Sequence, residues 1–227
     1  MLLIDKYAYT NKLADYNPMT KFIFVIGALT IVIFFNNPYI NMSIFIIMSF
    51  LTIFVANIPL NKYLKIMAMP IVFLMISIIA ILLSISPNDI FIFSVKISNK
   101  YIGITRESLT ESINTLSRVL ASISSTFFLA LTTPLNNIIK ILKKLKLPNV
   151  LIELLVLIYR FIFIVLDESK DIIIAQEMKF GYNNMKNSYR SIALLIKSLF
   201  IRVLLRYEDM IISLDSKLYN GEFKIGD

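Results

Sequence analysis

Forty consecutive residues without a charged side chain, between Lys21 and Lys62, constrain the fold of this 227-residue chain more than any other feature. As a helix, at about 1.5 Å per residue, this stretch would measure about 60 Å, which is twice the hydrocarbon thickness of a bilayer. The turn Asn36-Asn37-Pro38 divides it into two apolar runs, and such a turn favours an antiparallel hairpin. The stretch predicts two membrane-spanning helices, over about 22–35 and 39–56.

Composition supports a membrane protein, because 57% of the residues are hydrophobic, only 17% are charged, and the mean hydropathy is +0.75. Residues 66–87 carry no charge and predict a third span, with Pro70 tolerated near its start. A helical pattern begins at Thr105, and its uncharged part, residues 119–139, predicts a fourth span that ends near Thr132-Thr133-Pro134, with Pro134 in the first position of a new helix. Between these spans, residues 89–104 read as a short strand pair or an extended loop.

Lysine and arginine residues set the expected orientation. With a cytoplasmic N-terminus, the inner segments of the first four spans carry nine of these residues, and the outer segments carry three, Lys96, Lys100 and Arg106, before Arg118 at the edge of the fourth span. This asymmetry fits the positive-inside rule, so we expect both the N-terminus and segment 134–147 in the cytoplasm of the cell that bears this membrane protein. The start of the chain shows no removable signal peptide.

After residue 148 the charge pattern no longer fits a crossing. Segment 150–166 is apolar but contains Glu153 and Arg160, and basic residues lie on both of its flanks. Its helical periodicity continues to about Phe180, and a second periodic segment covers about 191–219. We therefore predict an all-α integral membrane protein: a domain of four transmembrane helices over 1–132, and long amphipathic helices on the cytoplasmic side over 133–227.

Several charged groups were candidates for sites. Segment 134–147 resembles a basic interfacial helix that contacts the lipid bilayer, or a simple membrane-surface linker. Arg160 is predicted to form a structural ion pair, either with Glu153 or with an acid of another helix. The acids Asp167, Glu168 and Asp171 favour a charged face over a metal site because Lys170 lies among them.

Missing residue types exclude whole classes of chemistry. The chain has no Cys and no His, which removes thiol nucleophiles, imidazole bases and Cys/His metal sites. None of its five glycines lies in a nucleotide-binding motif, so we expect no cofactor, no metal site and no catalytic residue. The net charge of +8 follows the membrane topology, and we expect no nucleic acid partner.

Three stretches together resemble the transmembrane (T) component of energy-coupling factor (ECF) transporters, a class of ABC importers, and most of all its cobalt-type CbiQ family. The first is Ile4-Asp5-Lys6-Tyr7-Ala8-Tyr9 with Asn17-Pro18-Met19-Thr20-Lys21. The second runs from Thr132-Thr133-Pro134 through Lys146-Leu147-Pro148 to Tyr159-Arg160 and Asp167-Glu168, and the third from Arg206-Tyr207-Glu208 to Gly221-Glu222.

The resemblance implies two short X-Arg-X motifs near the ends of cytoplasmic coupling helices, which dock on two ABC ATPase subunits. By position they fall on Met178-Lys179-Phe180 and on Ser216-Lys217-Leu218. Both arginines are lysines here, which keeps the charge and loses the planar fork of the guanidinium.

The resemblance further implies a non-catalytic permease subunit of the cell membrane that transmits ATP-driven motion to a substrate-binding membrane subunit (S component). Cobalt is the expected substrate, and ATP is hydrolysed by the partners. Nickel or a vitamin remains an alternative substrate, and a self-contained membrane carrier and a membrane-bound enzyme remain alternative classes.

Overall fold

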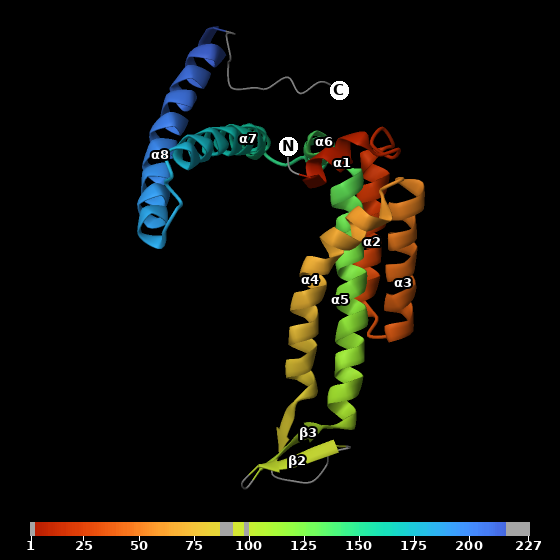
Figure 1. The fold of residues 1–227 in the computed structure, drawn as a ribbon. Coiled ribbons are helices and arrows are strands. Elements are labelled where there is room, and N and C mark those ends of the chain that lie inside the picture. Colours follow the sequence, from red (N-terminus) through yellow and green to blue (C-terminus); the bar gives the residue numbers. More distant parts are fainter. Residues whose placement is uncertain (1–2, 87–92, 98–99, 217–227) are drawn as a thin grey trace. The chain divides into compact units, whose positions relative to one another are not determined.

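The computed structural model describes residues 3–86, 93–97 and 100–216 (Figure 1). The chain divides into two units, Met1–Ile138 and Ile139–Asp227, and each is described by itself. Helices dominate both units, which confirms the predicted all-α membrane class. Four helices of the described part are long and apolar enough to cross a membrane: Pro38–Val55, Leu60–Leu82, Arg106–Thr132 and Asn149–Met178.

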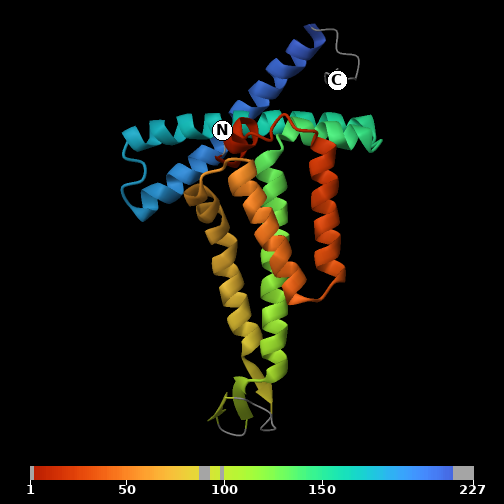
Figure 2. The ribbon, with the colours of Figure 1, turned by 90° about the vertical axis from the view of Figure 1, so that its right-hand side faces the viewer.

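Unit 1 is built around helix α5 (Arg106–Thr132), which contacts every other long helix of the unit. Figure 2 shows the helices that run along it: α2 (Pro18–Phe34), α3 (Pro38–Phe50) with its π-helical extension η1 (Leu51–Val55), and α4 (Leu60–Leu82). The short helix α1 (Leu3–Thr10) contacts α5 as well and lies across its C-terminal end.

The predicted first hairpin is present as α2 and α3. Asn17 and Asn37 each accept a hydrogen bond from the backbone N–H two residues later, and a proline follows each of them at the start of the helix. However, α2 has only 17 residues and a length of about 25 Å, which is short for a crossing. It is therefore absent from the set of four long apolar helices, which contains α7 (Asn149–Met178) in place of the predicted span 22–35.

Two helix boundaries differ from the prediction. Helix α4 begins at Leu60, so Pro70 lies inside the helix and not near its start. Helix α5 begins at Arg106, in agreement with the helical pattern predicted from Thr105, and the side chains of Thr105 and Ser108 form its capping box. Its end at Thr132 agrees with the prediction, while Pro134 lies just before helix α6 (Leu135–Lys144) instead of inside it.

A small antiparallel sheet follows α4, with the strand order β1-β3-β2. Strands β2 (Phe93–Ile97) and β3 (Lys100–Ile104) confirm the predicted strand pair, and β1 (Ser84–Ser86) adds a third strand. The rest of the predicted segment, 89–92 and 98–99, lies outside the described residues.

Small residues of α5 allow close packing in unit 1. Ala121, Ser124 and Ser125 are fully buried, and each hydroxyl donates to the backbone carbonyl of Ala121. Small side chains let two helix backbones approach each other closely. In a membrane, van der Waals packing of this kind drives helix association, because lipid removes the hydrophobic effect between helices. Two apolar clusters flank this region: one of Val25, Ala28, Met48 and Phe128, and one of Ala56, Ile58, Tyr63, Met67 and Leu131.

Polar side chains from the N-terminal segment cap the C-terminal end of α5. The Lys21 ammonium is buried and donates to the carbonyls of Leu13 (2.8 Å) and Thr132 (2.7 Å). The Asn11 amide donates to the carbonyl of Leu131 at 3.1 Å. Because the last carbonyls of a helix have no partner within the helix, these bonds satisfy acceptors that α5 alone leaves open.

Candidate functional site

Two long helices, α7 (Asn149–Met178) and α8 (Met185–Ser216), form the main part of unit 2. Helix α7 confirms the prediction of one continuous helix to about Phe180, and α8 begins six residues earlier than expected. The apolar part of α7 is largely uncovered within the structure, with Leu151, Leu154 and Ile158 exposed. Its placement beneath the membrane stays a prediction, because length and composition alone would also allow it to cross.

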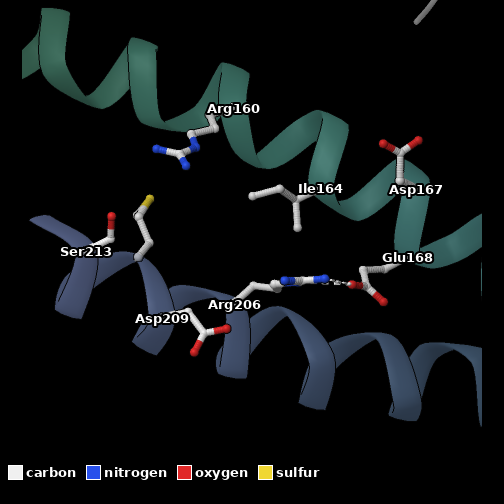
Figure 3. Close-up of a pocket in the computed structure, with 8 residues that line it drawn as sticks. Arg160, Ile164, Asp167, Glu168, Arg206, Asp209 and Ser213 are labelled. Atoms are coloured by element: carbon white, nitrogen blue, oxygen red, sulfur yellow. Dashed lines mark hydrogen bonds and ion pairs between the residues drawn. The ribbon is translucent and has the colours of Figure 1, made fainter.

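Glu168 joins the two helices through two arginines of α8 (Figure 3). Arg202 Nη1 donates to Glu168 Oε2 at 2.9 Å, and Arg206 Nε donates to Glu168 Oε1 at 3.1 Å. The side chain of Glu168 is only 12% exposed, while the arginines are about half exposed. The two arginines lie one helical turn apart, so one carboxylate fixes the register of α8 against α7.

The hydrogen bonds also set the charge state of this carboxyl group. Glu168 lies in the charged half of α7, after the apolar run that ends at Leu166. The hydrogen bond from Arg202 and then that from Arg206 hold the pKa of Glu168 below its usual value of 4.5. The ionised form is thus the one that holds α7 and α8 together.

We expect Glu168→Gln to loosen the contact between the two helices, because a neutral amide accepts weaker hydrogen bonds from guanidinium groups. Hydrogen exchange of the backbone amides of 198–210 should be faster at neutral pH in the variant. Since the folded-state pKa is lowered, the stabilisation is complete above pH 4.5 and is lost as the pH falls further. The difference in melting temperature between the two proteins should therefore close on acidification.

Asp171→Asn is the matched control for this prediction, because Asp171 is an exposed acid of the same helix and makes no ion pair with the described residues. It should leave the exchange of 198–210 unchanged. Equal exchange in Glu168→Gln and in the wild type would contradict a role of this ion pair in joining the helices.

A hollow of about 370 Å³ opens beside the ion pair, between α7 and α8. Charged and polar groups line most of it: Arg160, Asp167, Glu168, Arg206, Asp209 and Ser213, with Ile164 and Met210. Figure 3 shows the guanidinium of Arg160 at its edge. Within residues 3–86, 93–97 and 100–216, Arg160 pairs neither with Glu153 nor with another acid, and its predicted ion pair stays a prediction.

The turn between the helices is held by a compact hydrogen-bond network. Gln176 donates to the backbone carbonyl of Ser191 at 2.9 Å and accepts from the Tyr182 hydroxyl at 2.6 Å. Ser191 in turn donates to the carbonyl of Gly181 at 2.8 Å. A Cβ at Gly181 would lie 2.9 Å from the backbone oxygen of Gln176, so the close turn requires glycine there.

The first predicted docking motif lies on this turn. Met178 ends α7, and Lys179 and Phe180 follow it, with Phe180 in the left-handed region at φ 55°. All three side chains are exposed, Met178 by 72% and Phe180 by 71%. A cation between two large apolar groups is thus presented on a firmly held turn, which suits a protein contact.

Of the second predicted motif, Ser216 is the last residue of α8, and Lys217 and Leu218 lie outside the described residues. The Glu168 ion pair and the Gln176 network were not predicted from the sequence. The spacing of Arg202 and Arg206 on one face of a helix was the available signal for the ion pair, but the register of α7 against α8 was needed to use it.

The sequence profile of the cobalt transport protein family CbiQ matches residues 10–225. The chain belongs to the CbiQ family. The cobalt transport protein CbiQ of Salmonella typhimurium is 34% identical over 98% of this chain and 99% of its own length. These matches confirm the predicted family.

Two further relatives of the CbiQ family bear on the proposals below. A putative fused cobalt transport protein CbiMQ of Methanocorpusculum labreanum is 32% identical over 96% of this chain and 37% of its own length. The cobalt transport protein CbiQ of Rhodobacter capsulatus is 26% identical over 75% of this chain and 65% of its own length. The chain is thus a multi-pass membrane component of a cobalt transport family, and its relatives are named as transport proteins and not as enzymes.

Proposed function

We propose that this chain is the transmembrane coupling subunit of an ECF-type ABC importer, with cobalt ion as the transported substrate. In this role, two ABC ATPase subunits bind α7 and α8 and hydrolyse ATP. The resulting motion passes through the chain to a substrate-binding membrane subunit. The N-terminus lies in the cytoplasm, as the distribution of basic residues predicts.

The observation that carries the proposal is the turn at the end of α7. It presents Met178, Lys179 and Phe180 to a partner while the Gln176 network holds its backbone. A rigid support is what a motion-transmitting element needs, because a soft turn would absorb the displacement. The Glu168 ion pair serves the same end by making α7 and α8 move together.

Cobalt as substrate rests on the names of relatives that align over nearly the whole chain. The residues of the chain do not themselves favour cobalt over nickel or a vitamin, since the substrate contacts are assigned to the partner.

The test is purification of the tagged chain from its native membranes, with identification of every protein that accompanies it. P-loop ATPases together with a second multi-span membrane protein support the coupling role, and radiolabelled cobalt uptake by the reconstituted complex supports the substrate. Uptake of nickel or a vitamin in place of cobalt would correct the substrate alone. Cobalt transport by the isolated, monodisperse chain would overturn the coupling role in favour of a self-contained carrier.

A further inference from the structure

The α2–α3 hairpin of unit 1 stops well short of the sheet end of α5. Lys21 bonds to Thr132, which places the start of α2 beside the C-terminal end of α5. Arg118 Nη2 donates to Asn36 Oδ1 at 2.6 Å, which places the tip of the hairpin beside the middle of α5. Figure 2 shows this turn partway along α5. At about 1.5 Å per residue, the tip lies about 21 Å from Thr132.

Helices α4 and α5 continue past the hairpin. Ser108 Oγ lies 3.3 Å from the carbonyl oxygen of Leu82, so the two helices end at the same level, about 36 Å from Thr132. The outward side chains of α4 along this stretch are apolar and exposed: Phe73, Ile76, Ile79 and Leu83. Such a surface belongs in lipid, so the stretch beyond the hairpin tip lies largely within the membrane.

The tip of the hairpin is therefore inside the hydrocarbon layer. A layer of about 30 Å placed within the 36 Å between the levels of Thr132 and Ser108 leaves the tip about 9–15 Å below the boundary at the sheet end. Phe35, Asn36 and Asn37 lie between the two helices there and are exposed residues. Irregular backbone at this depth is tolerated only where protein covers it or water reaches it, because lipid offers no hydrogen bonds.

A stripe of polar side chains on α5 begins beside the hairpin tip and runs toward the N-terminal end of the helix. Glu107, Glu111, Asn114 and Arg118 recur at steps of four, three and four residues, which puts them on one face of the helix. Both glutamates are exposed, and Arg118 Nε is buried without a hydrogen-bond partner. We call this surface the polar step: Asn36, Asn37, Glu107, Glu111, Asn114 and Arg118.

We infer that the polar step is the docking surface for a transmembrane segment of another membrane subunit. The partner fills the space beyond the hairpin tip and keeps the step out of lipid. Its chemistry follows from the charges: an acceptor such as a carboxylate or amide oxygen at the depth of Arg118, and donors or a cation opposite Glu107 and Glu111 nearer the boundary. The inference rests on the proposed function for the identity of this subunit, the substrate-binding membrane subunit.

A photo-crosslinking experiment in the intact complex tests the surface. Asn114→p-benzoylphenylalanine and Glu111→p-benzoylphenylalanine carry the probe on the polar step, and Ile79→p-benzoylphenylalanine is the control at a similar depth on the lipid side of α4. Irradiation of native membranes should give an adduct with a different membrane subunit at positions 111 and 114, at a yield at least tenfold above that at 79. An adduct between two copies of this chain, or adducts with lipid alone, would overturn the inference.

Water in a vestibule is the alternative source of hydrogen bonds for the polar side chains of the step. Because the chain has no native cysteine, the single variant Asn114→Cys reports water access without background. Rapid labelling by a membrane-impermeant maleimide in the complete complex would overturn the inference, and protection that is lost when the other membrane subunit is absent would support it.

Substitution of Arg118 tests the inference by an independent measurement. Arg118→Leu should lower the recovery of the membrane subunit with the tagged chain at least tenfold, and Arg118→Lys should recover part of it. The melting temperature of the purified Arg118→Leu chain is measured beside it, and a loss of the membrane subunit that follows from unfolding of the chain itself would show a purely structural role and overturn the inference. Thr126→Val, at an exposed position of the inner half of α5, is the control.

Recovery of the ATPases in the same samples separates the two proposals. ATPases present without crosslinks at the polar step would defeat this inference and leave the coupling role standing. If neither the ATPases nor the crosslinks at the polar step are found, the coupling role is contradicted as well.

Discussion

Replacement of both Lys179 and Lys217 by Glu is expected to abolish recovery of ATPase subunits with the chain and to reduce substrate uptake to less than a tenth of the wild-type rate. Lys179 is exposed on the turn after α7, where it stands between Met178 and Phe180. Charge reversal places like charges against each other wherever the partner offers an acidic group, and such juxtaposition costs several kcal/mol. Each single variant should keep part of the activity, because the other site still holds the complex.

Substitution of both lysines by arginine should instead increase the recovery of ATPase subunits and the uptake of substrate. The double variant Lys179→Arg, Lys217→Arg keeps the charge and adds the planar guanidinium, with its several donors, that the family motif has at these positions.

Lys186→Glu is the control for the double Glu variant, since Lys186 is an exposed cation near the start of α8. Recovery of ATPases and uptake, both measured in membranes with equal amounts of chain, check the prediction. Intact assembly and uptake in the double Glu variant would show that the docking site lies elsewhere.

The membrane class and the long helix α7 could be predicted because both depend on local patterns. Uncharged runs report burial in lipid, and three- and four-residue steps report a helix, whatever the rest of the chain does. The start of α5 could be predicted as well, because the helical pattern begins at Thr105, which forms the capping box of α5 with Ser108. The charged N-terminal half of α5 contains most of the polar step.

Groups whose partners lie far along the chain could not be assigned from the sequence. Lys21 was counted as one of the basic residues that set topology, and its position beside an apolar run supported that interpretation. The structure buries it against a carbonyl 111 positions away. Nothing local distinguishes a lysine that flanks a membrane helix from one that caps a distant helix end.

Glu168 and Arg160 show the same limit within unit 2. Glu168 was placed on a charged face, yet it is mostly covered and bonded to Arg202 and Arg206. Arg160 lines the hollow between α7 and α8, and its expected ion pair stays a prediction. The two roles depend on the register between α7 and α8, which helical periodicity alone does not determine.

Lys21→Met is expected to destabilise unit 1 more than any other single substitution of a charged residue there. The variant loses two short hydrogen bonds from a buried ammonium group and leaves the carbonyls of Leu13 and Thr132 without these donors. Hydrogen bonds to charged groups contribute about 1.5–3 kcal/mol each, so the loss of both bonds is expected to cost about 3–6 kcal/mol. The measurement is thermal unfolding of the detergent-solubilised chain, followed by the loss of monodisperse protein.

Lys12→Met is the control, because Lys12 is an exposed lysine in the same N-terminal segment. An unchanged melting temperature in Lys21→Met would show that water replaces the ammonium at both carbonyls.

The hydrogen bonds of Lys21 at the C-terminal end of α5 also have a functional consequence. Thr132 is the last residue of α5, and α6 begins three positions later, so in the proposed coupling role any motion that α7 and α8 deliver along the chain enters unit 1 at this point. A loosened cap should therefore lower substrate uptake even at temperatures where the chain is still folded, and should do so without loss of the ATPases.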